Sequence, residues 1–248
     1  MRQLIYKVAR NECIARGVYE MRISGDVSDI TAPGQFINIK LEGEYLRRPI
    51  SVHDVDGSLE GMTIVYKVVG HGTERMSRLP VGARLDVLSG LGNGFDTSKS
   101  GERPLILGGG LGTAPMYLLA KKLVGEGKRV TAVLGFGGAD DIFGADELGA
   151  LGCEVRITTV DGTAGTKGFV TDAMPTAGEY TYTYTCGPEP MMRAVFGRAS
   201  TGGQYSFEAR MGCGFGACLG CSCKTVTGYK RICRDGPVLE REEILWEG

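Results

Sequence analysis

Cys213-Gly-Phe-Gly-Ala-Cys218-Leu-Gly-Cys221 is the most informative stretch of this sequence, and Cys233 follows after eleven intervening residues. The first three thiols have the C-x4-C-x2-C spacing of plant-type sites for a cluster of two irons and two sulfides. Such a cluster needs two thiolates per iron, and the glycines of this loop allow the backbone to close around it. The segment therefore predicts a small 2Fe-2S domain, with these four cysteines as ligands, that carries single electrons.

Other uses of the four thiols remain open at this point. Structural zinc is one, although zinc sites usually show two C-x2-C-type knuckles. Disulfides are another, but the chain runs from Met1 directly into polar sequence with no secretory signal. Cys223 could replace Cys221, but only Cys221 completes the spacing. The remaining cysteines are scattered and expected to be buried thiols: Cys13, Cys153 and Cys186.

Composition narrows the functional classes. The 248 residues are enough for two domains, or two and a small appendage. With 28 basic and 29 acidic residues, nothing suggests nucleic acid or a membrane surface as a partner, and no apolar run approaches the length of a membrane span. Eight cysteines without a targeting segment predict a reducing cytoplasm. Only His53 and His71 are present, which argues against a histidine-rich metal centre or a Ser-His-Asp hydrolase.

The N-terminal part, residues 1–100, has the pattern of β structure. Strands are expected at Ile5–Val8, Val18–Ile23, Phe36–Leu41, Met62–Val69 and Arg84–Leu88. Several short strands with few helical segments favour a barrel or a sandwich. A polar, turn-rich joint at Lys99–Pro104 marks the expected domain boundary.

From residue 101 to residue 204 the pattern changes to alternating strands and helices. Strands are expected at Leu105–Leu107, Arg129–Phe136, Glu154–Val160 and Tyr180–Cys186, and helices at Ala114–Val124, Asp140–Gly149 and Pro190–Ala199, with a short one starting near Gly168–Ala173. Such alternation builds a parallel sheet. Residues 205–248 are then the cysteine appendage.

Two glycine loops in this middle part lie between a strand and a helix. The first is Gly108-Gly-Gly-Leu-Gly-Thr-Ala-Pro115, and the second is Cys186-Gly-Pro-Glu-Pro-Met191. Glycines allow close backbone approach to a pyrophosphate, and the helix N-terminus offers N–H donors. Because the first loop is not a strict G-x-G-x-x-G, a tight turn without a ligand remains an alternative.

Two further features are suggestive only. Asp140 and Asp141 follow the second strand, where an acid can bind a ribose 2′-hydroxyl and favour NAD over NADP; a helix N-cap is the alternative. The barrel segment carries Arg47-Arg48-Pro49-Ile50-Ser51 and Val69-Gly-His-Gly-Thr73, and an arginine beside a glycine-threonine turn can neutralise a diphosphate.

Taken together, these motifs resemble the ferredoxin reductase superfamily and, within it, the electron transfer subunits of class B dihydroorotate dehydrogenases. The likeness rests on Arg-Arg-Pro-Ile-Ser, Tyr-Lys-Val-Val-Gly-x-Gly-Thr, Gly-Gly-Gly-Leu-Gly-Thr-Ala-Pro and the cysteine loop followed by Cys233-Arg-Asp-Gly-Pro-Val238. It covers nearly the whole chain. The fold that it implies is an antiparallel β-barrel, a parallel α/β nucleotide-binding domain and a small C-terminal 2Fe-2S domain.

The resemblance also implies roles for individual residues. The barrel would bind FAD, with Arg48 on the diphosphate, Ser51 near the reactive flavin nitrogen, and Gly72 and Thr73 on phosphate. The remaining implied flavin contacts are Pro49, Ile50, Val65, Tyr66 and Lys67. The middle domain would bind NAD through Gly109, Gly110, Gly112 and Thr113, with Cys186, Gly187 and Pro188 beside the nicotinamide. Cys213, Cys218, Cys221 and Cys233 match the family's cluster ligands, and Cys223 does not.

The implied activity is electron transfer rather than catalysis by a side chain. Electrons would pass between the FMN of a catalytic partner subunit and NAD, through the cluster and FAD, in pyrimidine biosynthesis. The expected assembly is a heterotetramer with two copies of each subunit, and Lys230, Arg231 and Arg234 beside Cys233 are candidate docking residues. Alternatives are an NAD(P)H-dependent reductase subunit for ferredoxin, sulfide or polysulfide, and a redox-sensing module without turnover.

Overall fold

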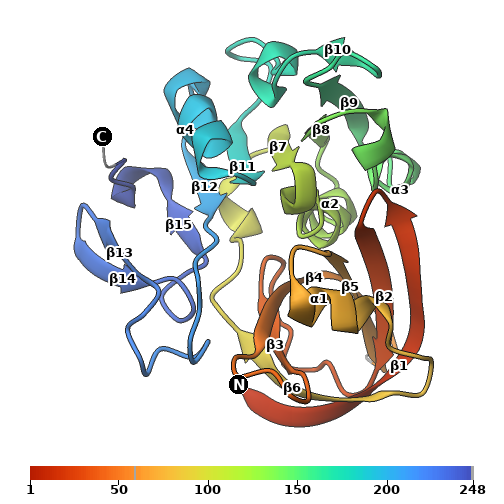
Figure 1. Cartoon of the computed structure of the whole chain (residues 1–248). Coiled ribbons are helices and arrows are strands. Elements are labelled where there is room, and N and C mark those ends of the chain that lie inside the picture. Colours follow the sequence, from red (N-terminus) through yellow and green to blue (C-terminus); the bar gives the residue numbers. More distant parts are fainter. Residues whose placement is uncertain (59, 247–248) are drawn as a thin grey trace.

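The computed structural model of the chain describes residues 1–58 and 60–246. Its N-terminal part is a closed barrel of antiparallel strands in the order β1-β2-β5-β4-β3-β6 (Figure 1). The strands are β1 (Arg2–Ala15), β2 (Val18–Ser24), β3 (Phe36–Lys40), β4 (Arg48–Val55), β5 (Gly61–Lys67) and β6 (Arg84–Leu91), and α1 (His71–Ser77) lies between β5 and β6. The predicted barrel is confirmed, and β4 is a strand that the sequence pattern did not indicate.

Side-chain alternation explains the barrel. Along β6, buried and less buried residues alternate strictly, as expected for a strand with one face on a core. The interior is filled by large side chains, among which Tyr6, Met21, Ile64 and Tyr66 are completely buried. Closure leaves no sheet edge unpaired, so short strands of this kind become stable.

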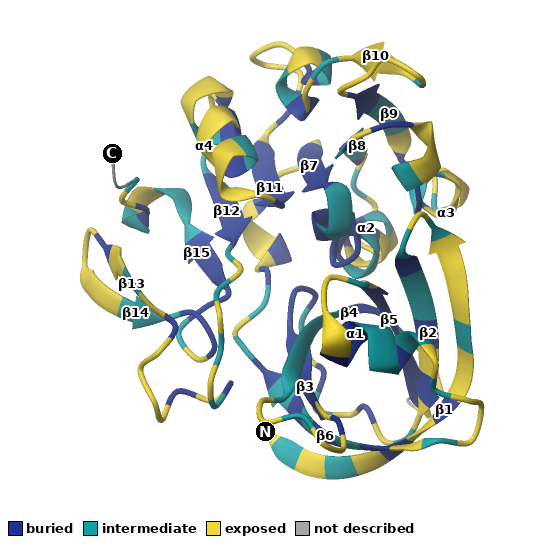
Figure 2. Cartoon of the chain, in the orientation of Figure 1, coloured by how far each residue is buried: buried dark blue, intermediate teal, exposed yellow. Residues whose placement is uncertain are grey.

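The middle part is an α/β sheet in the order β10-β9-β8-β7-β11-β12-β15. Its strands are β7 (Pro104–Gly109), β8 (Thr131–Phe136), β9 (Glu154–Thr159), β10 (Thr166–Lys167), β11 (Tyr182–Cys186), β12 (Gly203–Ser206) and β15 (Val238–Glu240). All neighbours are parallel except β12 and β15. Every residue of the central strand β7 is buried, because helices cover both faces of the sheet (Figure 2).

Two hydrophobic cores lie on the two faces of this sheet. One packs α2 (Met116–Gly125) and α3 (Ala145–Ala150) against the sheet, with Leu119 and Leu123 contributing from α2. The other packs α4 (Glu189–Arg198) and continues into the C-terminal segment, because it includes Cys221 and Cys233. The cysteine region is therefore attached to the sheet through a shared apolar core.

Some predicted element boundaries differ from the structure. The helix expected at Asp140–Gly149 is a 3₁₀ turn at Ala139–Asp141 followed by the short α3, because Gly144 interrupts the chain with a left-handed φ of 74°. The segment near Gly168 forms β10 and a 3₁₀ turn at Val170–Ala173. Further 3₁₀ turns lie at Thr97–Lys99, Gly110–Thr113 and Arg241–Glu243.

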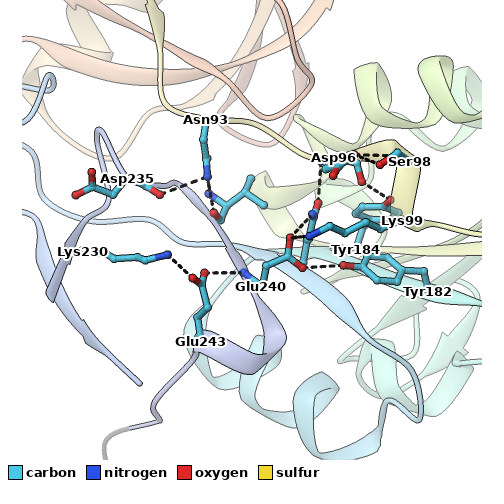
Figure 3. Close-up of polar contacts among 12 residues, drawn as sticks. Asn93, Asp96, Ser98, Lys99, Tyr182, Tyr184, Lys230, Asp235, Glu240 and Glu243 are labelled. Carbon is cyan, nitrogen blue, oxygen red and sulfur yellow. Dashed lines mark hydrogen bonds and ion pairs between the residues drawn. The ribbon is translucent and has the colours of Figure 1, made fainter. Parts of the chain in front are cut away.

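The C-terminal region is a hairpin of β13 (Ser222–Thr225) and β14 (Gly228–Arg231), after which β15 returns to the α/β sheet. A polar network ties these parts together (Figure 3): the Glu240 carboxylate accepts from Lys99 at 2.6 Å and from the Tyr182 hydroxyl at 2.9 Å. The proposed division at residue 204 falls within β12, so the sheet continues across it. The division into 1–100, 101–204 and 205–248 stays a proposal, and its last two residues lie outside the described ones.

In residues 1–58 and 60–246, the helices are all too short or too polar to cross a lipid bilayer.

Candidate functional site

A cavity of about 360 Å³ lies where the barrel, the α/β sheet and the C-terminal segment meet. The barrel contributes residues at the start of β4, the end of β5 and the first turn of α1, and these are eight of the nine residues expected to contact a flavin: Arg48, Pro49, Ile50, Ser51, Val65, Tyr66, Lys67 and Thr73. The segments Arg48–Ser51 and Val65–Lys67 become neighbours here because β4 and β5 pair in the barrel. The cavity is predominantly apolar with a few polar groups at its edge, which is typical of a cofactor site.

Gly72, the ninth residue, lies against Arg48. A Cβ on Gly72 would overlap the Arg48 guanidinium, so the glycine makes room for this side chain. Arg48 pairs with Glu44 and donates to the Leu46 carbonyl. Glu44 also accepts from His71 at 2.6 Å, and this hydrogen bond, opposed by partial burial, lowers the pKa of Glu44. Arg48 and the N-terminus of α1 fit a diphosphate group, because the guanidinium is held beside the backbone N–H groups of the first turn.

The two glycine loops of the α/β sheet pack directly on each other. A Cβ on Gly112 would overlap the carbonyl of Cys186, and one on Gly109 would overlap the Met191 sulfur. Loop-to-loop packing therefore requires glycine at position 112 and favours it at position 109, a reason that sequence reasoning did not consider beside phosphate binding and a tight turn. The contact fixes the carboxyl ends of β7 and β11, the edge where open α/β sheets bind ligands.

A second cavity of about 470 Å³ lies at this edge. Of the residues expected to bind NAD, Gly109, Gly110 and Pro188 line it, whereas Cys186 lines the first cavity. Gly112, Thr113 and Gly187 are not among the lining residues of either cavity. Sequence reasoning missed the large apolar side chains that form much of this cavity: Phe136, Val160, Phe169 and Met191.

The two acidic residues after β8 differ in their surroundings. Asp141 accepts from Arg16 of the barrel at 2.6 Å, and this hydrogen bond lowers the pKa of Asp141. The side chain of Asp140 is exposed. An acidic contact to a ribose at this edge would therefore come from Asp140, since Asp141 already joins the barrel to the α/β sheet.

The four cysteines of the loop form two pairs. Cys213 and Cys218 lie together, with backbone N–H groups of Ala217 and Cys218 directed at the Cys213 sulfur at 3.2 and 3.4 Å. Cys221 and Cys233 form the second pair, in which the Cys233 N–H is 3.4 Å from the Cys221 sulfur. The hairpin β13–β14 brings the second pair together, because the Ile232 N–H donates to the Cys221 carbonyl at 3.1 Å. A cluster of two irons requires two thiolates for each iron, and the two pairs match this arrangement.

The two pairs of cysteines differ in the pKa values of their thiols. Although burial opposes it, backbone N–H groups of Phe215 and Cys218 lower the pKa of Cys213 to about 6. Burial and the neighbouring Cys221 raise the pKa of Cys233, and a bound cation would favour its thiolate form.

Zinc fits this region poorly. A zinc ion with four bonds of about 2.3 Å would bring the sulfurs to within about 4 Å of one another. In the described part of the chain, the cysteines provide no three ligand atoms within 4.8 Å. All eight cysteines are free of disulfides, and Cys223 lies on β13 opposite Lys230. Cys153 and Cys186 are buried as expected, whereas the expectation was wrong for Cys13, which is exposed on a mostly exposed part of β1.

Sequence reasoning also missed the C-terminal wall of the first cavity, which has no motif of its own. It consists mainly of Phe207, Glu208, Ala209, Met211 and Pro237. Glu208 also lines a third space of about 370 Å³ beside the cysteine hairpin. Only the fold reveals this wall, because the segment is placed by the pairing of β12 with β11 and β15.

The candidate docking cations are mostly engaged within the chain. Lys230 pairs with Glu243 (Figure 3), and Arg231 donates to Asp235 at 2.9 Å and to the Gly216 carbonyl at 3.0 Å. These contacts hold the hairpin and the cysteine loop in place. Arg234 packs its side-chain carbons beside Gly216.

Models of two known domain families match the chain. Residues 208–245 match the iron-sulfur cluster binding domain of dihydroorotate dehydrogenase B, and residues 106–196 match the oxidoreductase NAD-binding domain. The matched ranges contain the four-cysteine loop and both glycine loops.

Similar proteins cover the full length. A dihydroorotate dehydrogenase B (NAD(+)) electron transfer subunit from a Geobacillus species (strain WCH70) is 42% identical, with 99% of each chain aligned. One from Fusobacterium nucleatum is 39% identical, with 96% of each aligned. Among solved structures, a chain of the NADH-dependent reduced ferredoxin-NADP oxidoreductase superposes with a TM-score of 0.88 at 31% identity, covering 98% of this chain and 90% of that one.

The FAD/NAD-binding domain of a Vibrio cholerae nitric oxide dioxygenase shares the reductase fold at a TM-score of 0.66 and 22% identity, with 78% of this chain and 91% of that one covered. The chain belongs to the family of dihydroorotate dehydrogenase B (NAD(+)) electron transfer subunits. The predicted family and fold class are thereby confirmed.

Proposed function

We propose that this chain is the electron transfer subunit of a class B dihydroorotate dehydrogenase, which connects the FMN of a catalytic partner subunit to NAD. Bound nicotinamide and flavin exchange electrons in pairs, whereas an iron–sulfur cluster carries one electron at a time, so the three groups together connect two-electron and one-electron chemistry. The side chains position these groups and exclude water, and none is assigned a catalytic role.

One observation supports this proposal most strongly. Met211 lines the first cavity, and Cys213 is only two residues farther along the chain. Two residues span at most about 7 Å, so the wall of the flavin cavity continues into the cysteine loop. On the opposite side, Cys186 lines the first cavity while Pro188 lines the second. A flavin in the first cavity would therefore lie between the nucleotide and the cysteines.

The residues proposed to hold each group follow from this arrangement. Arg48, Gly72 and Thr73 would hold the FAD diphosphate, and Ser51 with Val65–Lys67 would contact its ring. NAD would occupy the second cavity at Gly109, Gly110 and Pro188. Cys213, Cys218, Cys221 and Cys233 would hold the cluster, as two pairs.

The catalytic partner is proposed to carry FMN and to assemble as two copies with two copies of this chain. Because Lys230 and Arg231 already have intramolecular partners, Arg234 is the better candidate of the three for a contact across the interface. Arg234→Glu should weaken assembly more than Arg78→Glu, an exposed arginine of the barrel. Equal affinity of the two variants for the partner would count against docking beside Cys233.

A second candidate function has a specific observation in its favour. The superposed ferredoxin-NADP oxidoreductase chain is similar over nearly the full length, so a ferredoxin-linked reductase subunit is the alternative. Co-purification separates the two. A copurified FMN protein that reduces NAD from dihydroorotate supports our proposal, and exclusive coupling of ferredoxin to NADP would overturn it.

A further inference from the structure

We propose that Glu20, His53 and Glu147 form a binding site for one divalent transition-metal ion of the zinc class, which joins the barrel to the α/β sheet. Glu20 lies on β2 and His53 on β4 of the barrel, and Glu147 lies on α3. One oxygen from each carboxylate and one imidazole nitrogen lie within 4.8 Å of one another. None of the three ligands lines either cavity or belongs to the cysteine loop, although Ala114, whose carbonyl contacts His53, lines the first cavity.

The orientation of the histidine ring is fixed. His53 is 4% exposed, and its ring stacks on Tyr117 of α2 at a centroid distance of 4.7 Å. Its Nδ1 lies 2.8 Å from the Ala114 carbonyl oxygen, which can only accept a hydrogen bond, so Nδ1 carries the proton. In the neutral ring Nε2 therefore presents its lone pair. Metal-binding histidines commonly have this second contact, which sets the tautomer and the ring orientation.

The carboxylates face this lone pair. The Nε2 atom lies 3.3 Å from a carboxylate oxygen of Glu147, and Glu20 completes the group. A protonated ring has a single N–H on this side, whereas a dication is attracted to both carboxylates at once. One imidazole with two carboxylates suits zinc-class ions better than magnesium or calcium, which prefer oxygen ligands alone.

The surroundings allow the ligands to close around an ion. Zinc bonds of about 2.1 Å would draw each ligand atom in by roughly 1 Å, which the Glu147 side chain can do because it is half exposed. The nearest competing cation is Arg10, at 3.5 Å from Glu20, but Arg10 has its shorter contact with Glu12 at 2.6 Å. Glu20 is therefore available as a ligand.

The test measures zinc bound by the cofactor-loaded chain, after mild removal of loosely held metal, by equilibrium dialysis against Zn²⁺ and metal analysis. The wild type should bind one zinc ion with micromolar affinity and gain several degrees in Tm. His53→Gln and Glu147→Gln should each weaken binding at least tenfold and remove the gain in Tm. Asp146→Asn, an exposed neighbour on the same turn of α3, should behave as the wild type.

Glu147→Gln keeps the test decisive if His53→Gln fails to fold, since Glu147 is half exposed and its replacement leaves the ring contacts intact. Absence of zinc binding by the wild type at 100-fold molar excess would overturn the proposal. So would equal zinc affinity in all variants, which would place the ion elsewhere, for example on cysteine sulfur.

Discussion

The cysteine loop and the flavin cavity are two proposed cofactor sites built in opposite ways. Three of the four cysteines lie within nine residues of one another, and one hairpin supplies the fourth. The cavity is lined by residues from Phe36 to Pro237, which only the complete fold brings together. A local site leaves a spacing in the sequence, whereas a site built from distant segments does not. Substitutions at one site should therefore abolish cofactor binding there without affecting cofactor binding at the other.

The largest effect is expected from removing one cysteine of a pair. Cys218→Ser should reduce bound iron from two per chain to nearly none, because the Cys213–Cys218 pair cannot be replaced locally. FAD affinity should change less than about threefold, since neither residue lines the cavity. Metal analysis and flavin titration measure the two quantities.

Cys223→Ser is the control for this experiment and should keep its iron. Retention of iron in Cys218→Ser together with loss in Cys223→Ser would show that Cys223 is a ligand. Loss of FAD in Cys218→Ser would show that the two sites are not independent.

The next largest effect is expected at Gly72. In Gly72→Ala, the added methyl group would displace the Arg48 guanidinium, and loss of a charged hydrogen-bonding pair should weaken FAD binding roughly 10- to 100-fold. Gly57→Ala is a matched control on the barrel, because its added Cβ meets no atom within 4 Å. Unchanged FAD affinity in Gly72→Ala, measured by flavin fluorescence, would remove Arg48 from the proposed site.

A smaller, structural effect is expected where the glycine loops meet. Gly112→Ala should destabilise the fold by about 1–3 kcal/mol, because its Cβ would overlap the backbone of Cys186 and neither loop can move freely. NADH affinity should fall with it, while iron content stays constant. The control is Gly125→Ala in α2, where a Cβ has open space. Denaturation curves measure the stability and NADH titration measures the affinity. Wild-type values for both would show that the loops adjust to the added methyl group.

The smallest effect is expected at the contact between Arg16 and Asp141. Arg16→Gln should lower Tm by at most about 3 °C, because the Arg16 side chain is mostly exposed to solvent. The Arg16 hydrogen bond lowers the pKa of Asp141, so its stabilisation is present above the unfolded pKa of about 3.9 and disappears as pH falls through the lower folded pKa. Melting curves of wild type and variant should therefore converge at acid pH. A difference that grows with acid would contradict this assignment.

The same contrast explains how far the sequence could predict the structure. The barrel, the parallel sheet and the four-cysteine segment all leave periodic or spaced patterns, and each was predicted. Strand β4 was missed because its start, Arg48-Pro49-Ile50-Ser51, does not alternate, and its residues are held by β3 and β5. The return of β15 to the sheet was missed because Val238–Glu240 is only three residues long.

Individual site residues were predictable to different degrees. Nine flavin contacts were expected because their motifs resemble those of a known family. Eight of the nine line one cavity. Glu208 and Met211 carry no pattern and required the fold. Cys186 was expected beside the nicotinamide and lines the first cavity, and its role stays a prediction.

The most direct test of the account is anaerobic electron transfer in wild type and Cys218→Ser, each assembled with the catalytic partner. We predict that NADH still bleaches the FAD share of the flavin absorbance of the variant at close to the wild-type rate and leaves the partner's FMN oxidised, while dihydroorotate-dependent reduction of NAD falls at least a hundredfold. Dihydroorotate-dependent reduction of NAD at the wild-type rate by an iron-free variant would contradict the account, because electrons would then reach the flavin cavity without the cysteine loop.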